Sequence, residues 1–434
     1  MIISGSNDNF GANSIERFAD VSKLNSTHED AKGWLDGCPS PVNFWLKDKA
    51  VKSDAYQQVS DNKADTYGMD AVTAFYHSGH GLNSGGRVGV PMGAIYNGQT
   101  WVYSDQMSFG DAELRYLFWS ICSALATPLQ SWWLPNKGGL RMMFGYSTTT
   151  WDMMGYGKYF WKYVNQGKSF ARAFQDASYL LGKVQKPVVL ASAATQAEAR
   201  AMLANERTFS KVPSVKGWYE WQTGSTAQGI VQAGGQKAVT DIRIVPRHDK
   251  EKFKGAAKAV SIDDEGSLSL FFGTKGENRK EFPLAQAKAA ARRAISDYRL
   301  DEGIELVEGD TSTTTTQGGT LLGSGRMDEP TVIETRVQFR QAHSGIPSIG
   351  EGHGVINVDV DNDGSIVAIH DSTRKIIDEK PSKNKAHVER SHHKHVREDR
   401  TGYDFSTGKM TRQEDIEIDF GHGLKKNYRI RTEL

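Results

Sequence analysis

The sequence predicts an α/β fold over its first half, followed by smaller α+β modules. Three short, mostly apolar runs bounded by Gly or Ser (70–76, 114–119 and 139–145) are typical of strands buried on both faces of a parallel sheet. Helical spacing of apolar residues follows over 159–164 and 170–181. From about residue 236 the pattern changes to alternating, half-exposed strands.

The first module is expected to span residues 1–190. Tyr159, Phe160, Tyr163 and Val164 share one helical face, and Gly167 ends that pattern. Strands that alternate with helices indicate an α/β sheet, in which reactive groups gather beyond the carboxyl ends of the strands. Residues 191–235 form a connecting segment, with a helix predicted over 195–203 and an aromatic strand or loop over 217–224.

Four further segments follow. Residues 236–309 form an α+β module with strands at 238–245 and 267–272 and an alanine-rich helix at 284–295. The Thr- and Gly-rich stretch 310–330 is predicted as a linker. Residues 331–378 form a second small module, and residues 379–434 form a charged tail with an edge strand near 415–420. The tail's histidines, expected to be solvated, are His387, His392, His393 and His395.

Composition limits the cellular compartment and the classes of binding partner that are expected for this protein. Lys plus Arg (53) nearly equals Asp plus Glu (52), so no global field favours nucleic acid or anionic lipid. No apolar run has transmembrane length, and the first residues lack the order of a secretory signal. A cytoplasmic protein is therefore expected, or a secreted one if the native start is missing. Two cysteines make no disulfide framework, so both are predicted to be free thiols.

The chemistry is expected at His77–Gly81 and Ser120–Ser123, because each motif ends an apolar run. A thiol is mostly protonated at neutral pH, so a catalytic Cys122 needs a base such as the imidazole of His80. A glycine beside the histidine lets a substrate carbonyl approach the backbone, and the amides of Gly81 and Cys122 are candidates for an oxyanion hole. These residues indicate acyl transfer, and peptide hydrolysis in particular.

The order of these motifs resembles the caspase–gingipain–legumain clan of cysteine peptidases. The resemblance covers about residues 65–181. It is strengthened by the segment after the cysteine, where a Gly-rich strand with Phe144-Gly-Tyr-Ser-Thr148 leads into two helices. It implies a caspase-like parallel-sheet sandwich, Cys122 as nucleophile, His80 as acid/base and the Gly81 backbone in the oxyanion hole. The sequence departs from many members of the clan at Trp119-Ser-Ile121, where an acidic residue or Gln often precedes the cysteine.

Other interpretations stay open around this motif. His77, Ser120 and Ser123 are predicted to contact substrate, with His77 lining the cleft or tuning His80. His77 and His80 also form a His-x-x-His pair suited to a metal-dependent hydrolase, although no third and fourth ligands lie nearby in sequence, and no cofactor is expected. Cys122 as a buried core thiol would instead indicate an inactive, peptidase-like interaction protein. Cys38, beside Pro39 and Pro41, is read as structural.

A second resemblance lies near the C-terminus. The strand 337–341, the turn Gly345-Ile-Pro347 and the hairpin around Asp363-Gly364 are similar to the FTP/PepSY modules of thermolysin-type propeptides. The similarity covers about 331–375 and implies inhibition or chaperoning of a peptidase. Two interpretations stay open: an inhibitory module, acting within the chain until the linker 310–330 is cut or acting on another peptidase, and a plain binding or packing domain. Asp359–Gly364 begins like a calcium loop, but a hairpin turn is the favoured reading, because His370 stands where a bidentate Glu is needed.

Overall fold

The structure is a computed structural model, and it describes residues 9–58, 63–182, 184–225, 240–273, 282–322, 327–350, 352–382 and 396–434. The chain divides into two compact units. Unit 1 comprises residues 1–224, 316–330 and 418–427, and unit 2 comprises residues 225–315, 331–417 and 428–434. All ten tryptophans of the chain belong to unit 1, the last being Trp221.

Unit 1 is built around a mixed sheet with the strand order β2-β1-β3-β7-β8-β9-β10. Its strands are β1 (Phe10–Ser14), β2 (Val42–Lys47), β3 (Ala74–Ser78), β7 (Tyr116–Ser120), β8 (Met142–Tyr146), β9 (Pro187–Ala193) and β10 (Trp218–Gly224). A separate three-stranded sheet contains β4 (Leu82–Ser84), β5 (Arg87–Tyr96) and β6 (Gln99–Tyr103). The helices are α1 (Thr27–Asp36), α2 (Lys63–Tyr67), α3 (Pro128–Trp132), α4 (Tyr156–Asn165), α5 (Phe170–Leu181) and α6 (Gln196–Asn205).

The sheet is parallel from β2 to β8, but β9 pairs antiparallel with β8 and β10 pairs antiparallel with β9. The connection between β8 and β9 explains this difference from the parallel sheet expected. The helices α4 and α5, joined by a short turn at 166–169, reverse the chain twice, so β9 starts from the end of the sheet where β8 finished. An α/β fold is present, and its sheet is mixed.

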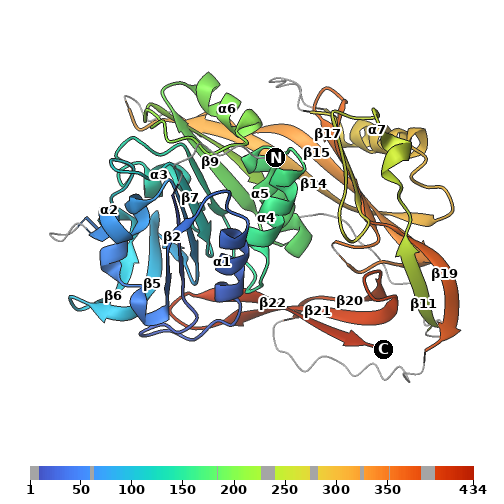
Figure 1. Cartoon of the computed structure of the whole chain (residues 1–434), viewed down its shortest axis with the longest axis horizontal. Coiled ribbons are helices and arrows are strands. Elements are labelled where there is room, and N and C mark those ends of the chain that lie inside the picture. The colour runs from blue at the N-terminus through green and yellow to red at the C-terminus, as the bar shows by residue number, and fades with distance from the viewer. Residues whose placement is uncertain are drawn as a thin grey trace. The chain divides into compact units, whose positions relative to one another are not determined.

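Successive side chains of the central strands point to opposite faces of the sheet and so divide the core of unit 1 into two layers. On β7, Tyr116 and Phe118 join the cluster that includes α1, α4, α5 and α6, whereas Leu117 and Trp119 join the cluster on the opposite face. Figure 1 shows α1, α4 and α5 along one side of the strands. Every residue of β3, β7 and β8 is buried, as expected of strands covered on both faces.

Unit 2 contains a sheet whose strands run in the order β12-β13-β18-β17-β15-β14. They are β12 (Ala259–Ile262), β13 (Leu268–Phe271), β14 (Glu305–Gly319), β15 (Thr331–His343), β17 (Val355–Asp361) and β18 (Ile366–Asp371), with β16 (Ile346–Pro347) beside β15. The alanine face of α7 (Leu284–Asp297) packs on this sheet. The expected modules 236–309 and 331–378 thus contribute to one sheet.

The predicted linker 310–330 differs most from the structure. Its residues 310–319 continue the long strand β14, in which Thr side chains alternate between more and less buried positions. Threonine is β-branched and favours an extended, half-buried backbone, so a run that resembled a linker by composition becomes a strand when neighbours accept its hydrogen bonds. Thr316 is an example of such a neighbour contact, because its hydroxyl donates to Glu220 Oε1 at 2.7 Å within unit 1. Residues 323–326 lie outside the described residues.

The predicted tail also holds regular structure. A two-stranded sheet pairs β11 (Thr240–Pro246) with β19 (Arg374–Pro381), and a three-stranded sheet contains β20 (Val396–Asp404), β21 (Lys409–Asp419) and β22 (Lys425–Glu433). The tail histidines His387, His392, His393 and His395 lie outside the described residues. The hairpin of β17 and β18 is confirmed, and its turn closes with Gly364 N donating to Asp361 O at 2.9 Å.

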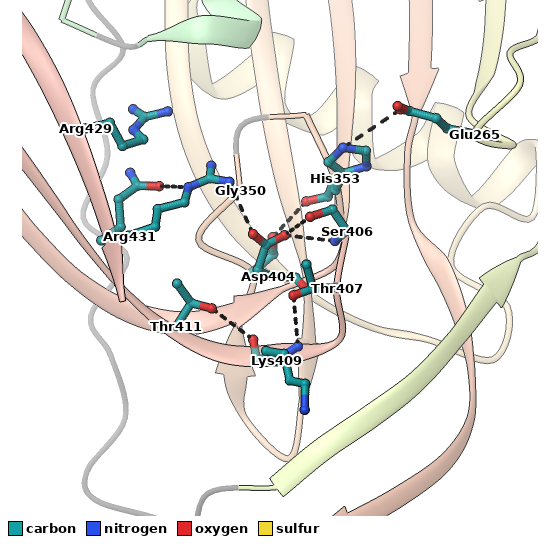
Figure 2. A network of polar contacts seen from close by, with 12 residues as sticks. Glu265, Gly350, His353, Asp404, Ser406, Thr407, Lys409, Thr411, Arg429 and Arg431 are labelled. Atoms are coloured by element: carbon teal, nitrogen blue, oxygen red, sulfur yellow. Dashed lines mark hydrogen bonds and ion pairs between the residues drawn. The ribbon is translucent and has the colours of Figure 1, made fainter. Parts of the chain in front are cut away.

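Asp404 fixes the turn between β20 and β21 in unit 2 (Figure 2). One carboxylate oxygen accepts from the amide of Ser406 at 2.8 Å, and the other accepts from Arg431 Nη1 at 3.2 Å. On the next pair of strands, Arg429 Nε donates to Asp415 Oδ1 at 2.8 Å. These contacts anchor the base of the β21–β22 hairpin in unit 2.

No helix among the described residues is long and apolar enough to cross a membrane. Both cysteines are free thiols, as predicted from their number.

The substitution Phe118→Ala tests the two-layer core of unit 1. The Phe118 ring stacks on Phe144 with 4.1 Å between centroids, so truncation is expected to lower the free energy of unfolding of unit 1 by about 3–5 kcal/mol. Urea unfolding followed by tryptophan fluorescence reports this unit alone. Ile95→Ala, at an exposed position of β5, is the control and should change stability by no more than about 0.5 kcal/mol.

Candidate functional site

The His-Gly motif and the cysteine motif lie at the carboxyl ends of two neighbouring strands. β3 and β7 pair in parallel with Ser78 opposite Ser120, and the next amide, Gly79 N, donates to Ser120 O at 3.4 Å. Parallel strands end at the same edge of a sheet, so both motifs leave it together. The structure thus brings together the two stretches that the sequence singled out.

Gly81 allows the two motifs to approach closely. A Cβ atom built on Gly81 would lie 2.7 Å from Ile121 Cδ1, a distance that real side chains do not tolerate. Any larger residue would push the histidine turn away from the residue that precedes Cys122. Neither the Gly81 nor the Cys122 amide donates a hydrogen bond to a protein acceptor among the described residues. Both amides are therefore available to a bound oxyanion.

His80 is fully buried and held in one tautomer. Its Nε2 lies 3.1 Å from Ser22 O, and since a carbonyl only accepts, Nε2 carries the proton. Nδ1 has no hydrogen-bond partner among the described residues, which leaves its lone pair open. Burial and the nearby Lys426 ammonium lower the pKa of His80 to about 3, while the Ser22 hydrogen bond opposes the shift.

Cys122 is 3% exposed, and three groups surround its sulfur. The thiol donates to Lys425 O at 3.0 Å, and the sulfur accepts from Thr150 N at 3.2 Å. The Thr150 hydroxyl lies 3.4 Å from the sulfur. Lys425 is part of the β21–β22 tip that belongs to unit 1, so these contacts lie within one unit. No hydrogen bond joins the Cys122 thiol to the His80 ring in the described part of the chain.

His77 lies in an aromatic cluster. It is fully buried, its ring packs against Trp119 and Tyr56, and its Nδ1 lies 2.6 Å from the Tyr56 hydroxyl. Burial, with a smaller contribution from Lys426, lowers the pKa of His77 to about 3. Its predicted contact with substrate stays a prediction. Within the described ranges, no three or more His, Cys, Asp or Glu residues are grouped to hold a metal ion.

Ser120 is bound to a group that the sequence interpretation missed, the carboxylate of Asp30 on α1. Asp30 Oδ2 accepts from Ser120 Oγ at 2.8 Å and from Ser78 Oγ and Tyr76 OH, each at 2.9 Å. Burial raises the pKa of Asp30, and these hydrogen bonds, with one from Gly157 N, oppose that shift. The available signal was the pair of hydroxyls at alternate positions of β3, Tyr76 and Ser78, which lie on one face and indicate a polar partner there.

Ser123 follows Cys122 in a left-handed backbone conformation, with φ of 56°. Its amide donates to Thr148 O at 3.0 Å, and its side chain is partly exposed. The positive φ turns the chain sharply after the cysteine and costs energy for a non-glycine residue. The predicted substrate contact of Ser123 remains a prediction.

Comparison with known proteins adds a family match over the first half of the chain. Residues 12–220 match a family described as a domain of unknown function, DUF6345, and this span is slightly less than half of the 434 residues. No curated protein matches the sequence. The matched region contains both His80 and Cys122 and ends before the β21–β22 tip. The chain is thus similar to a family whose function is undefined, over the residues that build the sheet of unit 1.

The substitution His77→Asn tests the neutral state of the buried histidine, since the Asn carbonyl keeps an acceptor for the Tyr56 hydroxyl. The folded pKa lies below the ordinary value of about 6.5, so the unfolded chain binds protons first as the pH falls. Stability present above about pH 6.5 is thus lost toward about pH 3, at up to about 1.4 kcal/mol per pH unit for each such histidine.

Unfolding in urea, followed by tryptophan fluorescence at several pH values, should show a shallower acid dependence in His77→Asn than in the parent. Equal slopes for the two proteins would contradict a neutral, buried His77.

Proposed function

We propose that the chain is a cysteine endopeptidase on a caspase-like α/β domain, with Cys122 as nucleophile and His80 as acid/base. The proposal extends to a protein or peptide substrate, to catalysis without a cofactor, and to a latent state imposed by the C-terminal part of the chain. It rests on the resemblance over residues 65–181 and on the placement of both motifs at one edge of the sheet.

One observation carries the proposal: a peptide carbonyl already lies against the thiol. Lys425 O is 3.0 Å from Cys122 Sγ, and the following residues run beside Thr150–Asp152. The space at the sulfur therefore accommodates an extended peptide main chain, which is the form in which a peptidase binds its substrate. A carbonyl placed there, with its carbon moved toward the sulfur, would be in position for nucleophilic attack.

The proposed reaction follows from the chemistry of these groups. The Cys122 sulfur forms a bond to the substrate carbonyl carbon while the thiol proton passes to His80. The amides of Gly81 and Cys122 stabilise the oxyanion. The carbon–nitrogen bond then breaks as His80 returns the proton to the leaving amine. Water, with His80 as base, hydrolyses the thioester and releases the second product and the free thiol.

The available lone pair on His80 supports this role. Nδ1 is the ring nitrogen that is free to take a proton, because Nε2 is bound to Ser22 O. In this clan-like arrangement the histidine acts on the leaving amine, so a hydrogen bond to the thiol in the resting state is not required.

An inactive interaction protein on the same scaffold is the second candidate. The missing hydrogen bond between Cys122 and His80, and the burial of both side chains, favour it. In that case the thiol would be one more small core residue.

The first test compares the full chain with its Cys122→Ala and His80→Gln variants against a proteome-derived peptide library. The full chain should generate new peptide ends over a long incubation, because a latent site opens transiently. His80→Gln should reduce their rate of appearance by roughly 10²–10⁴-fold, and Cys122→Ala should abolish them.

Tryptophan fluorescence confirms that each variant is folded. Cleavage that persists in Cys122→Ala would contradict the proposal and favour the metal-dependent alternative, and loss on adding a chelator would support that alternative.

A further inference from the structure

The tip of the β21–β22 hairpin, Ile418–Asn427, separates from the rest of its hairpin and belongs to unit 1. The tip turns tightly, since Phe420 N donates to Leu424 O and Leu424 N donates to Gly421 O, both at 2.9 Å. The turn residues 421–423 are exposed, whereas the side chain of Leu424 is fully buried. A hairpin anchored in unit 2 by Asp404 and Asp415 thus ends in a segment that packs as part of unit 1.

The main chain of the tip lies beside the segment that follows β8. Asn427 N donates to Thr150 O at 3.0 Å, and Asp152 N donates to Asn427 O at 3.1 Å. Two residues earlier, Lys425 O receives the Cys122 thiol. Lys425 and Asn427 are therefore both held through backbone atoms, in the way that a sheet edge binds an added strand.

Two side chains of the tip complete the contact. The Phe420 ring lies 5.0 Å from the His80 ring, centroid to centroid, at 65°. Lys426 is 2% exposed, and its Nζ donates to the Thr150 hydroxyl at 2.7 Å. That hydroxyl in turn lies beside the Cys122 sulfur. Phe420 and Lys425 thus cover the histidine and the cysteine respectively.

We infer that the tip Ile418–Asn427 is a built-in plug that occupies the place of a peptide substrate, so that the site opens only when the tip is displaced. That the tip inhibits an enzyme rests on the proposed function. That the tip fills the space beside Cys122 and His80 rests on the contacts alone. It assigns the inhibitory element to one hairpin tip rather than to the module at 331–375. It also assigns release to displacement of this tip, since residues 316–330 belong to unit 1 and Thr316 is bound there.

The bound geometry does not suit cleavage of the tip itself. The thiol donates its proton to Lys425 O, so the carbonyl oxygen and not the carbonyl carbon faces the sulfur. An oxygen held at the sulfur is not available to the Gly81 and Cys122 amides. The tip also buries His80 and places the Lys426 ammonium near it, and both effects lower the pKa of His80 and weaken it as a base.

The decisive variant removes the tip from the full chain. Residues 417–427 are replaced by an Asn-Gly turn that joins Ile416 to Tyr428, which suits a two-residue hairpin and also removes the backbone contacts of Asn427. The ion pair of Arg429 with Asp415 and the contact of Arg431 with Asp404 lie outside the deletion and should keep the hairpin base folded. The readout is the rate at which iodoacetamide modifies Cys122, followed by mass spectrometry, with Cys38 as the internal reference.

We expect Cys122 to react at least about tenfold faster in the shortened chain than in the parent, since a thiol that is 3% exposed becomes accessible. Peptide cleavage should rise by a similar factor. An unchanged Cys122 rate in a folded protein would overturn the plug. A faster Cys122 rate without any cleavage would support the plug and overturn the proposed peptidase, so the two failures are distinguishable.

Point substitutions in the tip provide a milder test if the deletion impairs folding. Lys426→Ala, combined with Phe420→Ala, removes two of the side chains that hold the tip and should accelerate alkylation of Cys122. Lys425→Ala is the matched control, because its side chain is exposed and its contact uses the main-chain carbonyl, which alanine retains. Equal rates in the double variant and the control would count against the plug.

A peptide added in trans tests whether the site is a peptide site. A synthetic peptide covering residues 418–428 should slow alkylation of Cys122 in the shortened chain. The same peptide N-methylated at the Asn427 amide cannot donate to Thr150 O and should protect less. Equal protection by both peptides, or none by either, would overturn the assignment of this backbone contact.

Discussion

Parallel pairing of β3 with β7 is the constraint on which the rest of the site depends. The register that sets Ser78 opposite Ser120 makes the histidine turn and the cysteine turn leave the sheet side by side. The buried Asp30 carboxylate fixes this edge, because it accepts hydrogen bonds from Tyr76, Ser78 and Ser120 and thereby ties α1 to both strands. A shift of one residue in this pairing would move the two motifs apart along the strands and remove the hydrogen bond from Ser120 to the carboxylate.

The histidine and the cysteine at this edge are both buried. His80 is neutral because its ring lies between Phe18 and Phe420 and near a lysine ammonium. Cys122 lies beneath a carbonyl of the same chain. A nucleophile and a base in such surroundings are protected from solvent, and any activity depends on what replaces the covering segment. In the proposed peptidase, catalysis and its control would therefore depend on the same few contacts.

Much of unit 1 was predictable from the sequence. The apolar runs near 70–76, 114–119 and 139–145 correspond to β3, β7 and β8, and the helical spacing corresponds to α4 and α5. Each element has a strong local pattern, so neighbours along the chain suffice to specify it. The strand β14 was missed because a Thr- and Gly-rich composition is common to linkers and strands, and only pairing partners distinguish them.

By itself, the sequence indicated the strands β3, β7 and β8 and the helices α4, α5 and α6 of unit 1, placed the histidine and cysteine motifs at strand ends, and predicted that both cysteines are free. These features depend on residue type and short-range periodicity. The tertiary structure decided the rest: that Asp30 lies beneath the site, that β9 makes the sheet mixed, and that Lys425, 303 positions beyond Cys122, meets its thiol. Contacts between residues so far apart leave no local pattern, because they arise from the path of the whole chain rather than from the preferences of any segment.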